Sequence, residues 1–402
     1  RGLGDVYKRQ DLAEADVILV NTCGFIEDAK REAIDSILEM AELKRDGTIQ
    51  RLVVTGCLAQ RYQQEVLDEI PEIDALIGIG ANDDIVKICE AAMAGAAMPS
   101  FPPRENMPLE GRRILTTPPH WAYLKIADGC SNCCAYCAIP GIRGAFRSRE
   151  MDSVVEEARE LAASGVKELI LVAQDPTAYG EDWGRPGAIC ELLDRLQEID
   201  GIRWIRILYA YPERISDAFI AAMVRNTKVV PYLDLPIQHC DDAVLKAMNR
   251  RGGRKEIEDA IARLRAAIPG ITLRTTLIAG FPGETEEQYA ELCDFVKTVR
   301  FDRLGCFAYS AEENTVAAKM PNQIDEETKQ RRADHIMELQ AEVSAEREGE
   351  KVGHTYECIC DGVDDETGMY LLRTKADCPE IDGSVLTLSL IHISEPTRHA
   401  QI

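Results

Sequence analysis

Four cysteines within eight positions have the type and spacing to bind a metal centre. They are Cys130, Cys133, Cys134 and Cys137, and they follow a short apolar run at 122–126 that predicts a β-strand. Thiolates are the ligands of iron–sulfur clusters, and Cys130, Cys134 and Cys137 have C-x3-C-x2-C spacing. Three such thiolates around a four-iron cluster leave one iron without a protein ligand, and a substrate can bind there.

Zinc, a disulfide and incidental cysteines are the alternatives. Two C-x2-C pairs are present, but structural zinc sites separate their pairs by about a dozen residues or more. Here the pairs abut, and adjacent Cys133 and Cys134 cannot easily point at one metal ion. A disulfide is typical of exported proteins, and we expect no export signal in this chain. The spacing therefore favours an iron–sulfur cluster.

The composition indicates a globular protein of two or three domains in a reducing compartment. The chain has 402 residues, of which 46% are hydrophobic, and 14 cysteines. No apolar run approaches the ~18–20 residues of a membrane span. We therefore expect a cytoplasmic protein without membrane contact, whose thiols stay reduced or bind metal.

The net charge of −23 at pH 7 bears on the expected partners. Such a charge repels nucleic acid and attracts basic proteins, although a local basic patch could still bind RNA. Residues 351–388 repeat the bias, with eight acidic residues against three basic ones. RNA-binding modules are usually basic, so we do not expect direct binding of nucleic acid.

Two further cysteines occupy equivalent places in a predicted N-terminal parallel α/β domain, residues 11–98. Strand patterns at 16–21, 51–55 and 75–78 alternate with helices at about 27–43, 59–69 and 83–94. Cys23 and Cys57 each follow a strand, so we expect both at the edge where ligands of parallel sheets collect. Spacing alone also allows two buried structural thiols.

Residues 116–337 predict part of an α/β barrel that carries the four-cysteine loop. Strands are expected at 122–126, 167–173, 204–208, 229–235, 272–278 and 303–307, and helices at 153–163, 189–196, 256–267 and 286–299. Functional residues of such barrels lie at the C-terminal ends of strands, which here carry Gln174, Gln238 and Glu284. His239 also lies there, but a lone histidine is more often structural than catalytic.

The remaining segments are expected to connect and close these domains. Residues 96–115 contain four prolines and predict a linker. A helix at about 326–348 leads into a small β module within 338–388. Residues 1–10 and 389–402 resemble translated sequencing adapters, so we exclude them and expect the chain to be a fragment.

The four-cysteine loop resembles the signature of the radical S-adenosylmethionine (SAM) superfamily. Its C-x3-C-x-aromatic-C pattern has Tyr136 as the aromatic residue. The resemblance implies a (β/α)6 partial barrel whose 4Fe-4S cluster binds the amino and carboxylate groups of SAM through its open iron. It further implies reductive cleavage of SAM to methionine and a 5′-deoxyadenosyl radical, which removes a hydrogen atom from the substrate.

Two other motifs resemble those of the methylthiotransferase family, NTCGFI at 21–26 and GCLAQ at 56–60. This resemblance covers residues 11–388. It implies an N-terminal domain with a second 4Fe-4S cluster on three cysteines, then the radical SAM core, then a small β-barrel called TRAM. The family's first cysteine of that second cluster falls before residue 11, so only Cys23 and Cys57 remain. Cys133 is extra to the motif and we interpret it as a bystander.

Five stretches resemble the branch of this family that modifies a ribosomal protein, namely AQD at 173–175, DLPIQH at 234–239, FDRLG at 301–305, YSAEE at 309–313 and PEIDG at 379–383. The tRNA-modifying branch usually has Gln-Ser where this chain has Gln238 and His239. The resemblance implies methylthiolation of the β-carbon of an aspartate on the small-subunit ribosomal protein S-twelve, with an electron donor as a further partner. A tRNA adenosine methylthiotransferase and a non-enzymatic metal-binding module are the alternatives.

The resemblance also implies how the cofactors are held. One 4Fe-4S cluster would bind Cys130, Cys134 and Cys137. The other, near Cys23 and Cys57, would hold or donate the sulfur that a second SAM methylates, and with two thiolates we expect it to be labile. For the SAM pocket we predict Tyr136, packed near the adenine, and four residues chosen by strand-end position: Gln174, Gln238, Arg274 and Glu284.

Overall fold

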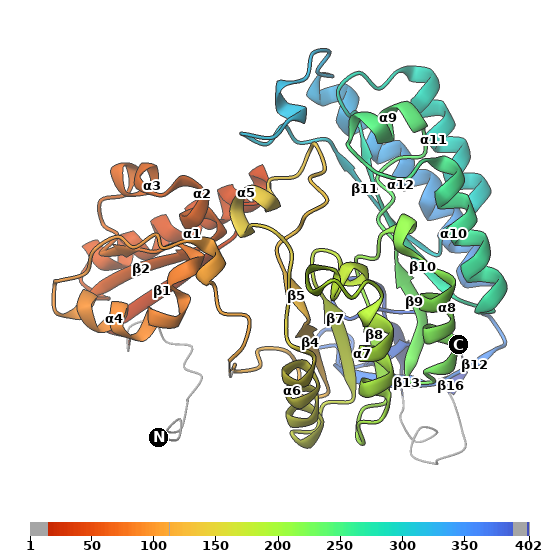
Figure 1. The fold of residues 1–402 in the computed structure, drawn as a ribbon, viewed down its shortest axis with the longest axis horizontal. Helices are drawn as coiled ribbons and strands as arrows, with labels where there is room; N and C mark the ends of the chain where they lie inside the picture. The colour runs from red at the N-terminus through yellow and green to blue at the C-terminus, as the bar shows by residue number, and fades with distance from the viewer. Residues whose placement is uncertain (1–14, 112, 389–399, 402) are drawn as a thin grey trace. The chain divides into compact units, whose positions relative to one another are not determined.

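The computed structural model describes residues 15–111, 113–388 and 400–401 (Figure 1). The described chain forms two compact units. The first contains the residues up to Gly111 together with Gly129–Ala145 and Ser310–Ala318, and the second contains the rest. Both units are built on parallel strands joined by helices, which confirms the α/β class predicted from the sequence.

The first unit has a three-stranded parallel sheet. Its strands lie in the order β1 (Val17–Thr22), β2 (Arg51–Gly56) and β3 (Ala75–Leu76). Its helices include α1 (Glu27–Arg45), α2 (Cys57–Tyr62), α3 (Gln64–Glu69), α4 (Ile85–Met93) and α5 (Ile139–Arg143). Helix α1 buries Ala33, Ile37 and Ala41, which are spaced four apart and therefore form one apolar stripe. This stripe packs in one cluster with Leu52 and Val54 of β2.

Two helices of the first unit differ from the sequence prediction. The helix expected at 59–69 is divided into α2 and α3, because Gln63 adopts a φ of 43° that is incompatible with a continuous α-helix. The helix expected at 83–94 begins later, after a 3₁₀ helix (Ile79–Asp84). No proline marks either the division at Gln63 or the later start of α4, so the hydrophobic pattern alone did not predict these two differences.

The second unit has a six-stranded parallel sheet whose spatial order follows the chain. Its strands are β4 (Trp121–Lys125), β7 (Glu168–Val172), β8 (Trp204–Ile207), β9 (Val229–Asp234), β10 (Thr272–Ala279) and β11 (Arg303–Ala308). Its helices are α6 (Met151–Ala163), α7 (Ala188–Gln197), α8 (Asp217–Arg225), α9 (Asp242–Ala247), α10 (Arg254–Ala267), α11 (Glu286–Val299) and α12 (Glu326–Gly349). The six strands predicted from the sequence are confirmed, and β4 and β11 form the two edges of a partial barrel.

Alternate residues of these strands pack on opposite faces of the sheet. Leu169 and Leu171 join the large core that includes the helices, whereas Ile170 packs in a separate cluster with Trp121 and Trp204. Both faces of the sheet are therefore covered at β4, β7, β8 and β9, which explains why these strands read as mainly apolar runs. Within the part of the chain that the structure describes, no helix is long and apolar enough to cross a membrane.

A small antiparallel module follows α12. Its strands are β12 (Thr355–Tyr356), β13 (Cys358–Val363), β14 (Tyr370–Thr374), β15 (Val385–Thr387) and β16 (Ala400–Gln401). Buried ion pairs attach the module to the barrel. Arg373 Nη1 lies 2.7 Å from Glu168 Oε2, and Arg206 Nε lies 2.8 Å from Glu168 Oε1, with all three side chains at most 2% exposed. Arg206 Nη1 also donates to the Lys375 carbonyl over 2.9 Å.

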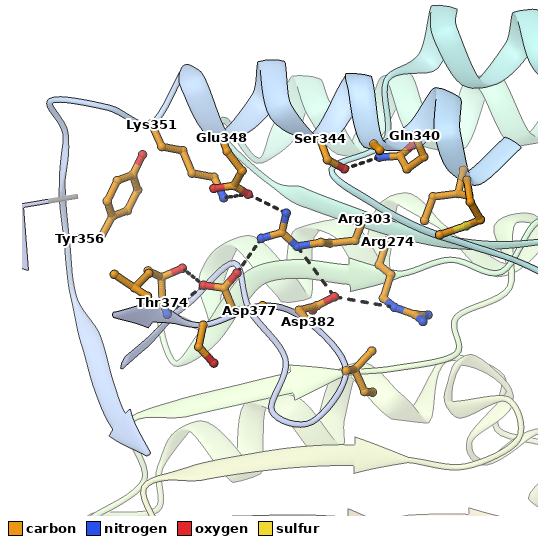
Figure 2. A pocket seen from close by; sticks show the side chains of 17 residues that line it. Arg274, Arg303, Gln340, Ser344, Glu348, Lys351, Tyr356, Thr374, Asp377 and Asp382 are labelled. Atoms are coloured by element: carbon orange, nitrogen blue, oxygen red, sulfur yellow. Dashed lines mark hydrogen bonds and ion pairs between the residues drawn. The ribbon is translucent and has the colours of Figure 1, made fainter. Parts of the chain in front are cut away.

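A cavity of about 520 Å³ lies between this module, β10, β11 and α12 (Figure 2). Figure 2 shows Arg303 between three carboxylates: its guanidinium lies 2.6 Å from Glu348, 2.8 Å from Asp377 and 3.9 Å from Asp382. Two of these acids belong to the C-terminal module. They are neutralised within the protein, so the count of acidic residues in the sequence overstates the charge that this module offers to a partner.

Candidate active site

The four-cysteine loop occupies Gly129–Ala145 and is closed at its base by a pair of short antiparallel strands, β5 (Ala127–Asp128) and β6 (Arg147–Ser148). The backbone N–H of Cys130 donates to the Gly144 carbonyl over 3.1 Å. Gly129 has a φ of 75°, and a Cβ there would lie 2.2 Å from the Ala145 carbonyl oxygen. Only glycine therefore fits beside the first cysteine of the loop.

The four thiols of this loop differ in exposure. Cys130 and Cys134 are buried and Cys137 is half-buried, whereas Cys133 is exposed and has a left-handed φ of 53°. Burial raises the pKa of the Cys137 thiol to about 12, and the neighbouring Cys134, Cys130 and Cys133 add to the rise. A thiolate in such a buried place suits a cationic centre, because a bound cation compensates the cost of burying the negative charge.

Among the described residues, no group of three His, Cys, Asp or Glu side chains is arranged to hold a single metal ion. A cubane cluster makes a different demand on its ligands, because each thiolate binds a separate iron. The ligand set Cys130, Cys134 and Cys137 stays a prediction from the spacing.

Cys23 and Cys57 lie at the C-terminal ends of neighbouring parallel strands, as the sequence predicts. Each follows one of the paired residues Thr22 and Gly56, in β1 and β2. Cys23 is exposed, and Cys57 is the buried first residue of α2. A Cβ on Gly24 would lie 2.7 Å from backbone atoms of Leu58, so glycine lets the loop after Cys23 pack against the start of α2.

Arg143 links the two sets of cysteines and was not identified from the sequence. It is the last residue of α5, in the four-cysteine loop, and its Nη2 lies within hydrogen-bonding distance, 3.5 Å, of Cys57 Sγ. Both residues belong to the first unit. The sequence gives no sign of this contact, because the two residues are separated by 86 positions.

The predicted pocket residues Gln174 and Gln238 follow β7 and β9. Gln174 Oε1 is buried and, among the described residues, has no hydrogen-bond partner. Such an atom normally binds a polar group, which a ligand can supply. Gln238 has a φ of 70°, and two backbone hydrogen bonds join it to β10: its N–H donates to the Thr276 carbonyl over 2.9 Å, and its carbonyl accepts from the Ile278 N–H over 2.8 Å.

Arg274 and Glu284 have partners within the second unit. Arg274 Nη1 lies 2.9 Å from Asp234 Oδ1, and Figure 2 shows Arg274 beside the cavity at the C-terminal module. Glu284 is fully buried; it accepts from Gly280 N–H over 3.0 Å and from Arg332 Nη1 over 2.7 Å. These contacts give both side chains a structural role that strand-end position alone did not predict.

His239 and Tyr136 complete the predicted residues. His239 Nδ1 accepts a hydrogen bond from the Asp241 N–H over 3.0 Å, so the ring carries its proton on Nε2, which lies 3.5 Å from Glu284. This arrangement inside the core agrees with a structural histidine. Tyr136 is half-buried in the four-cysteine loop, immediately before Cys137.

Three family descriptions match successive parts of the chain. Residues 4–78 match the Uncharacterized protein family UPF0004, residues 124–296 the Radical SAM superfamily, and residues 352–391 the TRAM domain. The second match begins in β4 and includes the four-cysteine loop, and the third covers strands β12 to β15.

Curated relatives are similar along almost the whole chain. A protein of Clostridioides difficile named ribosomal protein uS12 methylthiotransferase RimO is 47% identical over 385 residues, which are 94% of this chain and 86% of the relative. A protein of the same name from Lachnoclostridium phytofermentans is 48% identical over 376 residues, covering 93% and 86%.

A solved structure shows the same fold at low identity. The radical SAM methyltransferase TsrM of Kitasatospora setae, solved with cobalamin and a 4Fe-4S cluster, superposes with a TM-score of 0.57 and 16% identity, over 73% of this chain and 63% of that one. At this identity the likeness extends to the fold only.

Proposed function

Because the chain belongs to the family of ribosomal protein uS12 methylthiotransferases, we propose that it methylthiolates the β-carbon of an aspartate of uS12, the small-subunit protein S-twelve. The observation that carries the proposal is 47% identity over 94% of the chain. A ribosomal substrate would place the reaction in the cytoplasm, and an external donor would supply the electrons.

We assign the cysteines to the two 4Fe-4S clusters of a methylthiotransferase, the second of them with two of its three ligands. Cys130, Cys134 and Cys137 would hold the SAM-binding cluster, because they share one loop that Gly129 closes and two of them are buried in it. Cys23 and Cys57 would hold the second, because they end neighbouring strands. When bound, these clusters supply the electron for SAM cleavage and the site for the transferred sulfur. Arg143 would donate a hydrogen bond to a ligand sulfur of the second.

The protein's own residues would bind and orient SAM. Gln174 has the strongest support, because its buried carboxamide oxygen lacks a partner among the described residues and would accept a hydrogen bond from SAM. Gln238 has its backbone fixed by two hydrogen bonds to β10, which would support a side chain that contacts SAM. Tyr136 would pack near the adenine. Arg274 and Glu284 would act chiefly through the residues that they hold in place.

Replacing Gln174 tests this pocket. Gln174→Leu introduces an apolar side chain of similar size and removes the acceptor. The affinity for SAM should therefore fall about 5- to 100-fold, as is typical when a buried polar partner is lost. The thermal midpoint should change little, because the wild-type oxygen makes no internal hydrogen bond. Calorimetric titration of SAM measures the effect, with Gln330→Leu on the exposed face of α12 as the control. Unchanged affinity would remove Gln174 from the pocket.

The choice of substrate is tested by incubating one preparation of the protein separately with each of the two candidate substrates, uS12 and tRNA. Reconstituted protein, SAM and a reductant are incubated without oxygen with isolated uS12 or with tRNA, and both are analysed by mass spectrometry. We expect a mass increase of one methylthio group on uS12 only. Modification of tRNA instead would favour the tRNA branch.

Binding of uS12 should also weaken as salt rises, because exposed charges are screened over about 8–10 Å at physiological ionic strength. We expect a moderate salt dependence. Asp361, Asp377 and Asp382 pair with arginines inside the second unit, which leaves exposed residues such as Asp365 and Glu366 to attract a basic partner. Tighter binding of tRNA than of uS12 would contradict this expectation.

A further inference from the structure

Glu312 is a buried carboxylate in Ser310–Ala318, a segment that follows β11 in the sequence but packs in the first unit with both sets of cysteines. The residue is 2% exposed. A buried carboxylate is stable only when cations or N–H groups surround it. Its partners therefore show what the segment holds in place.

Glu312 caps helix α1. The backbone N–H of Glu27, the first residue of α1, donates to Glu312 Oε1 over 2.8 Å. The helix has no side-chain cap of its own at Ile26, and one turn later Lys30 Nζ lies 3.5 Å from Glu312 Oε2. A carboxylate at this position satisfies an unpaired N–H and opposes the positive end of the helix dipole. Glu312 therefore fixes the start of the helix that follows Cys23.

Arg61 connects the same carboxylate to helix α2, which begins at the other candidate ligand of the second cluster. Its Nη1 lies 3.1 Å from Glu312 Oε2 and donates to the Gly24 carbonyl over 2.9 Å. Its Nη2 donates to the Glu313 carbonyl over 2.8 Å. The planar guanidinium has its donors in a fixed geometry, so one side chain holds α2, the loop after β1 and Ser310–Ala318 together.

The other end of the segment contacts the four-cysteine loop. The backbone N–H of Ala317, which is fully buried, donates to the Ala135 carbonyl over 2.9 Å, in the middle of that loop. Between the two ends, Thr315 Oγ1 donates to the Glu312 carbonyl over 2.7 Å and closes a turn. A short segment with an internal hydrogen bond therefore reaches from one set of cysteines to the other.

We propose that Ser310–Ala318 is a bracket that fixes the two sets of cysteines relative to each other, and that Glu312 is its positioning residue. The inference rests on the proposed function, because sulfur transfer requires that SAM cleavage and the sulfur-bearing site act on one substrate carbon. Glu312 lies in the stretch YSAEE at 309–313, one of those that resemble the ribosomal-protein branch. Loss of the bracket should leave SAM cleavage intact and uncouple it from transfer.

Glu312→Gln tests the bracket. Glutamine keeps the size of the side chain but turns an amide N–H toward the donors of Glu27, Lys30 and Arg61. Glu313→Gln is the matched control, because Glu313 is exposed and reaches Arg61 through its backbone carbonyl. Arg61→Lys keeps the charge, loses the fixed pair of donors and serves as a milder variant if Glu312→Gln does not fold.

Hydrogen–deuterium exchange of the full chain, before cluster reconstitution, gives the first measurement. Hydrogen bonds to charged groups contribute about 1.5–3 kcal/mol, and each 1.4 kcal/mol is a factor of ten. We therefore expect exchange to rise about tenfold or more at 24–30, 58–62 and 134–137 together in Glu312→Gln, while β7 and β8 keep the wild-type rate. A rise confined to 310–318 would overturn the bracket, whatever reaction the protein catalyses.

The second measurement uses reconstituted protein with SAM, reductant and uS12. In Glu312→Gln the ratio of 5′-deoxyadenosine to methylthiolated uS12 should rise about tenfold, with the KM for SAM unchanged. A parallel fall of both products would indicate a purely structural role and contradict the inference. Wild-type protein whose iron content shows both clusters, and which cleaves SAM but never modifies uS12, would refute the proposed function alone. The exchange result would then decide whether Ser310–Ala318 acts as a bracket.

Discussion

Alanine at Cys130, Cys134 or Cys137 will abolish the formation of 5′-deoxyadenosine from SAM, whereas Cys133→Ala will retain most of it. The first three thiols are buried or half-buried on a loop closed by Gly129, while the fourth is exposed. Losing an outer-shell partner of a metal site already costs about 10- to 100-fold, so loss of a direct ligand should cost more than about 100-fold. Chromatographic assay of 5′-deoxyadenosine after anaerobic reconstitution measures the effect.

Iron content and thermal unfolding of the same four variants separate ligand loss from misfolding. The three ligand variants should bind less iron than Cys133→Ala while their metal-free forms unfold at a similar temperature, because the loop lies outside the main core of the barrel. If Cys133→Ala stopped cleavage and Cys130→Ala or Cys134→Ala did not, the ligand set inferred from the spacing would be wrong.

Glu168→Gln will lower the free energy of unfolding by about 3–5 kcal/mol, the usual result of removing one partner from a buried ion pair. Arg206, which is fully buried, would keep its charge without a carboxylate, and Arg373 would lose one of its two acidic partners. A domain typically has only about 5–15 kcal/mol of stability, so the effect should be large. Urea unfolding followed by circular dichroism measures it.

Glu357→Gln provides the control for this variant. Glu357 lies 2.9 Å from Lys375 in the same C-terminal module, but the two side chains are 52% and 39% exposed. Exposed pairs contribute about 0–1 kcal/mol, so the loss should be small. Equal losses in the two variants would show that burial of the Glu168 pair is not the source of its effect.

Local patterns were sufficient for the strands and for the cysteine loop. Strands β4, β7, β8 and β9 are short, mainly apolar runs whose two faces are both buried, so their sequences differ from those of the amphipathic helices on either side. The spacing of Cys130, Cys134 and Cys137 brings these thiols onto one loop, because ligands three or four residues apart need no distant contact to meet. Family membership followed from the same short motifs.

The sequence was less informative about charged residues at strand ends. The place of Arg274 and Glu284 at the SAM pocket stays a prediction. What the sequence did not indicate is that Arg274 binds Asp234, 40 residues away, and that Glu284 binds Arg332, 48 residues away. The position of a residue at the end of a strand predicts where its Cα lies. It does not predict which oppositely charged side chain will lie beside it in the folded protein. A buried charge takes the partner that best compensates it, and that partner is set by tertiary packing.

The sequence by itself determined the α/β class, the order of the elements, the candidate cluster ligands and the family of this protein. Only the tertiary structure decided that Gly129–Ala145 and Ser310–Ala318 pack with the N-terminal unit. The physical reason is the range of the interactions: strand and helix patterns are local, whereas Glu312 caps α1 at Glu27 from 285 residues away. No local sequence pattern predicts which buried carboxylate will cap which helix terminus, because the two groups come together only when the chain folds.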